Sequence, residues 1–234
     1  MNKIRRGNRE GSRLFGYLMV VPATLLLVVV SIIPLLDGVY LAFTNTNINT
    51  GADAWVGIQN FVEIFQDSKF YQVFGFTILY AFAVVLFSYI LGMLIALLLN
   101  QDIRFRGVFR AIILAPWVVP PVVATITWSW LLNDKVGLIN TVLQNIGMIQ
   151  EPIYFLSDLT LVKGTVIAFG VWKSYPFMMI TLLAGMQSID GVLYEAAKID
   201  GAGKVKAFFH ITMPMMKNVS FVCTILMFIW TINN

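Results

Sequence analysis

Cysteine and histidine are almost absent from this sequence, which contains one of each, Cys223 and His210. A disulfide framework needs paired cysteines, and a zinc or redox motif needs several Cys or His side chains at fixed spacing. Cys223 lies within an apolar run, where it is most simply a small packing residue. The sequence therefore predicts neither a disulfide nor a metal site.

Charge is also scarce, because 12% of the residues are charged whereas 59% are hydrophobic. The apolar residues come in long uncharged runs, which is typical of chains that cross a bilayer and excludes an ordinary soluble domain. The formal net charge of +4 falls in short loops between these runs. This distribution argues against nucleic acid as a partner and favours membrane lipid.

Motifs for catalysis and nucleotide binding are missing as well. The segment Gly201–Lys204 has two glycines and a lysine, but it lacks the four-residue gap of a phosphate-binding loop, and Val205 stands where Ser or Thr would hold magnesium. No Gly-x-Ser-x-Gly or His-Glu-x-x-His motif is present. We expect no catalytic residues and no bound cofactor, so any ATP must be bound by a separate chain.

Five apolar segments approach the length of about 20 residues that a helix needs to cross a membrane. We therefore predict an all-α, polytopic transmembrane helix bundle of five spans, forming a single domain over residues 1–234. The third segment should be kinked, because it contains Pro116, Pro120 and Pro121. The segments are Gly16–Phe43, Phe74–Leu99, Ala111–Leu132, Thr165–Met186 and Val219–Trp230.

The connecting regions carry helical signals of their own. The patterns of Val56–Phe65 and Gly137–Ile149 predict two short amphipathic helices, and Asn45–Asp53 reads as a polar turn region. Lys and Arg placement predicts the orientation of the spans. Of the 16 Lys and Arg residues, only Lys69, Lys135 and Lys163 fall in the loops that would share one side of the membrane. The basic N-terminus and the loop after the fourth span are therefore predicted to be cytoplasmic.

That loop, residues 187–218, is polar and rich in Ala and Gly. Asp190 can cap a helix over Gly191–Ile199, and Gly201 can adopt the left-handed conformation that ends a helix. A second short helix is expected from Lys204 to Ile211, and Pro214 should stop it or open the next span.

The loop resembles the cytoplasmic coupling loop of ABC importer permeases. The matching residues are Glu195, Ala196, Ala197, Gly201, Ile211 and Pro214, with Met213 in place of the usual Leu. The segments Gly57–Phe61, Leu114–Pro121 and Trp172–Phe177 are similar to the sugar-importer branch related to maltose and glycerol-phosphate uptake systems. Such permeases usually have six spans, so we expect this sequence to lack the sixth, at its C-terminal end.

The resemblance implies a transport subunit of a bacterial inner membrane. It implies as partners ATP-binding cassette subunits that grip the coupling loop, a second homologous permease subunit and an extracytoplasmic solute-binding protein. The solute could be a sugar, a polyol or glycerol phosphate. A secondary transporter is the competing interpretation, but it would predict intramembrane acidic residues and repeated halves. Neither is visible in the sequence.

Candidate residues for the translocation pathway cluster in the fourth span. Trp172, Tyr175 and Phe177 have rings that can stack on a sugar face, although anchoring at the membrane interface is the simpler interpretation. Lys173 is the one cation within a predicted span, and such residues are often functional. We favour a structural role in which its long side chain extends outward to the membrane surface.

Overall fold

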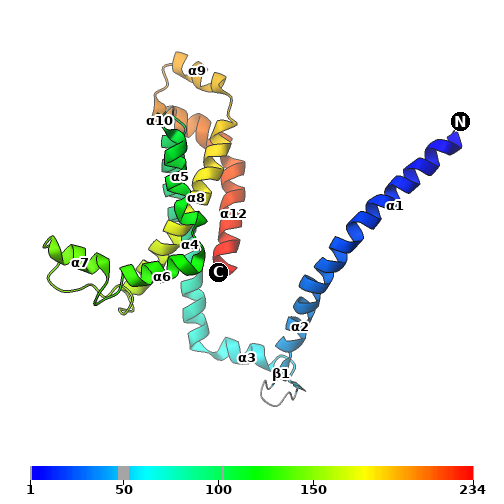
Figure 1. Ribbon diagram of the computed structural model, residues 1–234, viewed down its shortest axis with the longest axis horizontal. Helices are drawn as coiled ribbons and strands as arrows, with labels where there is room; N and C mark the ends of the chain where they lie inside the picture. Colours follow the sequence, from blue (N-terminus) through cyan, green and yellow to red (C-terminus); the bar gives the residue numbers. More distant parts are fainter. Residues whose placement is uncertain (1, 47–52, 102, 234) are drawn as a thin grey trace. The chain divides into compact units, whose positions relative to one another are not determined.

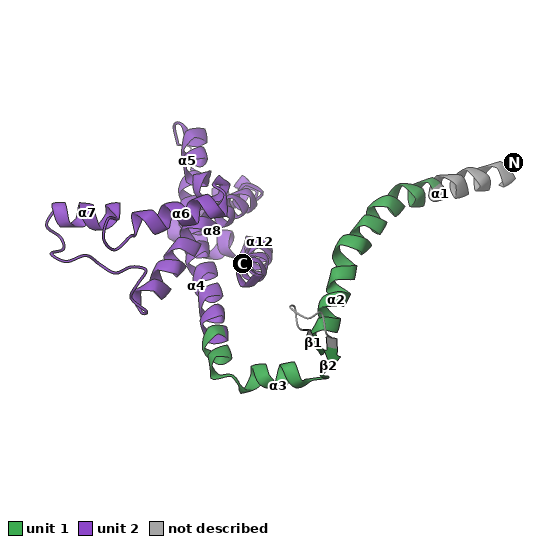
Figure 2. Cartoon of the chain, turned by 60° about the horizontal axis from the view of Figure 1, so that its bottom comes forward, with its two compact units in different colours: residues 1–73 green, residues 74–234 purple. Residues whose placement is uncertain are grey.

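The structure is a computed structural model that describes residues 2–46, 53–101 and 103–233 (Figure 1). Most of these residues are helical, as expected for an all-α membrane protein. The chain divides into two compact units, residues 1–73 and 74–234 (Figure 2). The single domain inferred from the sequence stays a prediction.

The first unit begins with a long apolar helix. It consists of α1 (Asn2–Leu27), a π-helical turn η1 (Val28–Ile32) and α2 (Ile33–Ala42). The π turn ends two residues before Pro34, whose missing N–H and ring disturb regular hydrogen bonding in the preceding turn. The part from Phe15 to Ala42 is long and apolar enough to cross a membrane, which agrees with the first predicted span.

A small β-hairpin follows this helix, and the segment Gly57–Phe61 forms the turn after the hairpin and the start of the next helix. Strands β1 (Thr44–Thr46) and β2 (Asp53–Trp55) pair antiparallel, and α3 (Gln59–Gln66) comes next. The Asn60 amide donates to the carbonyls of Ala42 and Thr44, both at 3.0 Å, and so ties α3 to the end of α2. The turn before α3 needs Gly57, whose φ is +59°. Most of the predicted polar turn region 45–53 lies outside the described residues.

The second unit is a bundle built around α4 (Ser68–Leu99), α8 (Leu161–Gln187) and α12 (Lys217–Asn233). Helices α4 and α8 approach closely at Gly92, where an added Cβ would lie 2.7 Å from Met178 Cβ. Met179, Leu182 and Cys223 are buried in the same core. In lipid, such contacts between small residues and large apolar side chains supply the packing that holds helices together.

Helix α5 (Arg106–Val118) and helix α6 (Pro121–Leu131) meet at an angle of 91°. This bend confirms the kink predicted for the third span. A second bent pair joins Lys204–Met215 to α12 at 66°. Within the residues that the structure describes, three helices are long and apolar enough to span a membrane, or up to five spans result if each bent pair is one span.

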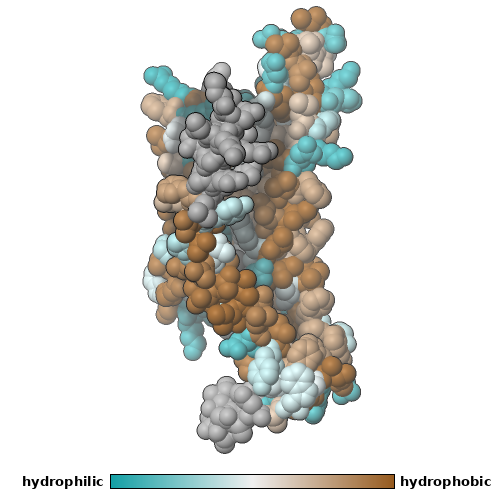
Figure 3. Space-filling model, turned by 90° about the vertical axis from the view of Figure 1, so that its right-hand side faces the viewer, coloured by the Kyte–Doolittle hydropathy of each residue, from teal (hydrophilic) through white to brown (hydrophobic). Residues whose placement is uncertain are grey.

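Two connections complete the bundle. Helix α7 (Leu138–Asn145) confirms the short helix predicted in Gly137–Ile149. The loop after α8 contains α9 (Gly191–Ile199), α10 (Lys204–Ala207), the π turn η2 (Phe208–Thr212) and α11 (Met213–Met215). On the face seen in Figure 3, hydrophobic side chains cover the middle, and hydrophilic ones gather at the upper end, at the height of α9 in Figure 1.

Candidate functional site

The first half of the loop 187–218, hereafter the coupling loop, is a helix with both ends closed by its own residues. Asp190 Oδ1 accepts a hydrogen bond from the Val192 N–H at 3.0 Å, which makes Asp190 the predicted N-cap of α9. At the other end, Gly201 N donates to Lys198 O at 3.1 Å and Ala202 N donates to Ala197 O at 2.8 Å. This is the Schellman pattern, and Gly201 supplies its left-handed residue with a φ of +75°.

The second half of the coupling loop returns the chain to the bundle. The predicted helix over Lys204–Ile211 is present as α10 followed by the π turn η2, which includes Ile211. Pro214 stands in the first turn of α11 and leads into the next span. The Tyr194 and Thr212 hydroxyls lie 2.9 Å apart and join the two halves of the loop. A cavity of about 620 Å³ opens between these halves and the end of α4.

An apolar strip on α9 is exposed although it lies in a polar loop. The side chain of Ile199 is 87% exposed and that of Val192 is 63% exposed. Both lie on one helical face with Ala196, because the residues are spaced by four and three positions. Glu195 and Ala196 are also exposed and Ala197 is half-buried, so α9 presents a small-residue surface that a partner can approach closely.

The break between α5 and α6, hereafter the elbow, has a cause in the sequence. A residue before proline is pushed toward extended conformations, and Val119 and Pro120 both precede a proline. Their ψ angles are 130° and 139°, so α5 ends and α6 starts in a new direction. Pro120 and Pro121 also lack N–H groups, which removes the donors that a continuing helix would offer to the carbonyls four residues earlier.

The Lys173 ammonium lies on the carbonyls of the elbow. Lys173 Nζ on α8 donates to Pro116 O at 2.8 Å and to Trp117 O at 3.2 Å, and it also donates to Val119 O. The side chain therefore bonds to the neighbouring helix α5 rather than extending outward to the membrane surface. Two residues further along α8, the Tyr175 hydroxyl donates to Ile113 O at 3.2 Å.

A cavity of about 300 Å³, hereafter the elbow cavity, opens beside this contact. Three aromatic residues lie around it, and the Phe177 ring is 5.1 Å from Trp230 and 6.3 Å from Trp117. Polar groups are present beside the rings, because Ser174, Lys173 and Thr231 also line the cavity. Rings next to hydroxyl groups offer apolar faces and hydrogen bonds to the same ligand.

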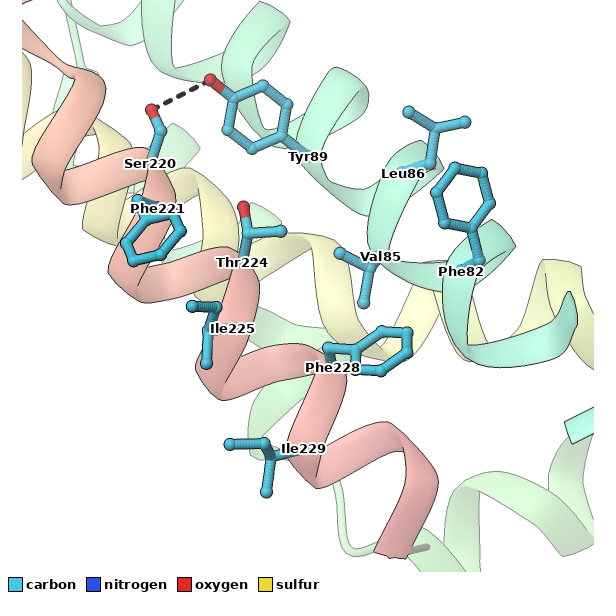
Figure 4. Close-up of a pocket in the computed structure, with 10 residues that line it drawn as sticks. All are labelled: Phe82, Val85, Leu86, Tyr89, Ser220, Phe221, Thr224, Ile225, Phe228 and Ile229. Carbon is cyan, nitrogen blue, oxygen red and sulfur yellow. Dashed lines mark hydrogen bonds between the residues drawn. The ribbon is translucent and has the colours of Figure 1, made fainter. Parts of the chain in front are cut away.

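A groove between α4 and α12 is larger but differs in chemistry (Figure 4). Its volume is about 470 Å³, and most of the side chains that line it are apolar, including Phe82, Leu86 and Ile225. Tyr89, Ser220 and Thr224 carry hydroxyl groups in its lining, and the Tyr89 and Ser220 hydroxyls form a 2.9 Å hydrogen bond that Figure 4 shows at one end. A polar solute would find few free hydrogen-bonding groups there, because two of these three hydroxyls bond to each other, so the groove is a poorer solute site than the elbow cavity.

Comparison with known proteins decides which family this architecture represents. Residues 88–234 match the family described as binding-protein-dependent transport system inner membrane component. The chain belongs to this family. The match includes the coupling loop, α5, α6, α8 and α12.

Named relatives of this permease are transport subunits. It is 35% identical to the trehalose/maltose transport system permease protein MalF of Thermococcus litoralis, over 90% of this chain and 71% of the relative. It is 34% identical to the maltodextrin transport system permease protein MdxF of Bacillus subtilis, over 88% of this chain and 51% of the relative. The sulfoquinovosyl glycerol transport system permease protein SmoG of Agrobacterium fabrum is 32% identical, over 88% of this chain and 67% of the relative.

The fold of the permease is also found among solved structures. A bacterial ABC transporter that imports the acidic polysaccharide alginate superposes with a TM-score of 0.82, at 24% identity, over 95% of this chain and 75% of that one. A second structure contains the alginate transporter with a pentasaccharide-bound periplasmic protein and gives a TM-score of 0.80, at 24% identity, over 94% of this chain and 73% of that one. The permease is therefore a multi-pass membrane subunit of a binding-protein-dependent ABC importer, not an enzyme.

The four pathway candidates of the permease separate in the structure. Lys173 and Phe177 line the elbow cavity. Trp172 packs instead against Trp128 at 5.4 Å and against Phe169 at 6.0 Å, and the Tyr175 hydroxyl is bonded to α5.

Sequence reasoning missed several residues of these sites. Trp117, Trp230 and Thr231 come from two other helices, and no local pattern links them to Phe177. The exposed Val192 and Ile199 have a detectable signal, since their seven-residue spacing places two apolar residues on one face of a short polar helix. Among the described residues, no group of three or more His, Cys, Asp and Glu side chains is placed to hold a metal ion.

Proposed function

We propose that this permease carries a saccharide across the bacterial inner membrane, driven by ATP that partner subunits bind and hydrolyse. It works with a second homologous permease subunit and receives its solute from an extracytoplasmic binding protein. Its N-terminus and its coupling loop face the cytoplasm. The elbow cavity contributes to the solute pathway.

The coupling proposal is supported by the surface of α9. The helix needs no contact from the bundle to close its ends, because Asp190 and the Gly201 turn do so locally. It exposes Val192 and Ile199, apolar side chains that gain from burial against a partner. Lys198, Lys204 and Lys206 lie in the same loop, in accord with the excess of basic residues in cytoplasmic loops.

The saccharide proposal is carried by the lining of the elbow cavity. Trp117, Phe177 and Trp230 provide ring faces, and Ser174 and Thr231 provide hydroxyl groups. The Thr231 hydroxyl donates to Met227 O at 2.7 Å, so its oxygen can still accept a hydrogen bond from a solute hydroxyl. The transport of trehalose, maltose and maltodextrin by relatives supports the same solute class.

In transport, closure of the ATPase subunits would move α9, and the rigid helices of the bundle would pass this motion to the elbow cavity. Alternating access would then come from rigid-body motion of packed helices, without a chemical step in this chain. The Tyr194–Thr212 hydrogen bond ties α9 to η2, and η2 leads through α11 into α12, so the second half of the coupling loop connects α9 to the bundle.

The test is uptake of labelled saccharides by cells that contain the whole transporter and its binding protein. Trp230→Ala should raise the KM for the transported saccharide by about tenfold, because it removes a ring from the elbow cavity. Ile225→Ala removes an apolar side chain of the same helix from the α4–α12 groove and serves as the matched control. An unchanged KM for Trp230→Ala, with both variants present at normal levels, would contradict the role of the elbow cavity.

A panel of labelled solutes decides the class. Uptake of maltose, trehalose or a longer glucan is the expected result. Uptake of glycerol phosphate or a polyol, with no saccharide transported, would show that the solute is not a saccharide. The coupling proposal would still stand in that case.

A further inference from the structure

The elbow leaves two main-chain carbonyls without their usual donors. In a continuous helix, Pro116 O would accept from the N–H of residue 120, and Trp117 O would accept from the N–H of residue 121. Both of those residues are proline and have no N–H. Within a membrane span, lipid offers no donors to replace the missing ones.

Lys173 supplies three donors at this position. A lysine ammonium has three N–H bonds, and the structure gives Nζ three carbonyl partners, Pro116 O, Trp117 O and Val119 O. Two of these are the carbonyls deprived by Pro120 and Pro121. The positive charge also lies at the C-terminal end of α5, where the helix dipole favours a cation.

The elbow is in turn part of the wall of the elbow cavity. Trp117, Val118, Val119, Pro120 and Pro121 all line it, and Phe177 on α8 stands opposite with its ring 6.3 Å from Trp117. A shift of the elbow relative to α8 would change the spacing of these two rings. With all three N–H groups engaged by main-chain oxygens, Lys173 has none left to donate to a solute.

We propose that Lys173 is a positioning residue that replaces the amide donors missing from Pro120 and Pro121, and thereby fixes the elbow and the shape of the elbow cavity. It acts on the solute through the position of Trp117 and not by direct contact. This inference rests on the proposed role of the elbow cavity only for its effect on transport. The structural part stands on the hydrogen bonds alone.

The structural part is tested by a cycle of variants in the complete transporter. Lys173→Met keeps an unbranched stem but removes all three donors, and Lys173→Arg keeps a charged donor group. The double change Pro120→Ala with Pro121→Ala restores the two missing N–H groups. The readout is the thermal unfolding midpoint of the purified assembled transporter, which needs no solute.

We expect Lys173→Met to lower this midpoint clearly in the native background and by less than half as much when both prolines are alanine. Lys173→Arg should retain most of the native value. Equal losses in the two backgrounds would overturn the inference, because Lys173 would then not be replacing the donors that proline removes.

The transport part is tested by uptake kinetics of the same variants. Lys173→Met should raise the KM by about tenfold with a smaller change in the maximal rate, and Lys173→Arg should restore the KM to within about threefold of the native value. A fall in the maximal rate alone would contradict a role in shaping the elbow cavity. If Trp230→Ala has no effect on KM while the stability cycle shows the expected coupling, the elbow cavity proposal fails and the pairing of Lys173 with the two prolines stands.

Discussion

The elbow and the coupling loop both interrupt helical structure, but their free main-chain groups are satisfied in different ways. At the elbow, the donors come from Lys173, which is more than fifty residues away in the sequence and lies on a different helix. At the coupling loop, Asp190 and Gly201 close α9 with bonds inside the loop itself. The elbow is therefore part of the packed bundle, whereas α9 is a self-contained helix whose exposed face remains free for a partner.

This difference predicts that changes inside the bundle alter folding, while changes in the coupling loop alter transport and leave the fold intact. The bundle change with the largest expected effect is Gly92→Ala. Its Cβ would lie 2.7 Å from Met178 Cβ and 2.9 Å from Met179 N, and overpacking of this kind costs about 1–3 kcal/mol. The thermal stability of the purified subunit or complex measures the effect.

Gly75→Ala on the same helix is the matched control, because its Cβ would meet no atom within 4 Å. Equal stability of the two variants would mean that the close approach of α4 and α8 does not hold the bundle together.

In the coupling loop, the largest effect is expected for Gly201→Val. The added side chain meets no neighbouring atom, but the φ of +75° disfavours a β-branched residue by roughly 1–2 kcal/mol or more. We expect uptake to fall about tenfold, with normal membrane insertion and weaker co-purification of the ATPase.

Gly203→Val serves as the control, because Gly203 has a φ of −71° and a ψ of 168°, which valine adopts readily. If both valine variants transport equally well, the left-handed turn is not needed for coupling.

A smaller effect is expected for Asp190→Ala, which removes the N-cap of α9. Loss of such a cap costs about 1 kcal/mol of local helix stability. Hydrogen exchange at the Val192 amide should become faster, because this N–H loses its acceptor. Asp190→Asn retains a capping oxygen and should keep most of the protection. Equal exchange rates of the Val192 amide in Asp190→Ala and Asp190→Asn would show that the capping oxygen does not stabilise α9.

The smallest effect is expected for Tyr175→Phe within the bundle. It removes the 3.2 Å hydrogen bond from the Tyr175 hydroxyl to Ile113 O, and hydrogen bonds between membrane helices contribute about 0.6 kcal/mol on average. A thermal midpoint lowered less than that of Lys173→Met is the expected result. A larger loss than for Lys173→Met would make Tyr175 the main contact between α8 and α5.

The local features of the chain could be predicted from the sequence because they depend on neighbouring residues. The cap at Asp190, the left-handed turn at Gly201 and the kink at the prolines each follow from side-chain chemistry within a few positions. The apolar runs likewise predict helices, since the bilayer leaves few other ways to satisfy main-chain groups. The motif from Glu195 to Pro214 indicated the family, which the comparison confirmed.

The packing decided what the local pattern could not. Trp172, Lys173, Tyr175 and Phe177 are neighbours in the sequence, but the turns of α8 direct them to different partners, so only Lys173 and Phe177 reach the elbow cavity. The residues that complete this cavity come from α5, α6 and α12, and their meeting depends on how the helices cross. The sequence by itself determined the helices, their ends and their breaks, because these are short-range effects; the tertiary structure alone decided which carbonyls Lys173 would meet, because that contact depends on two helices packing side by side.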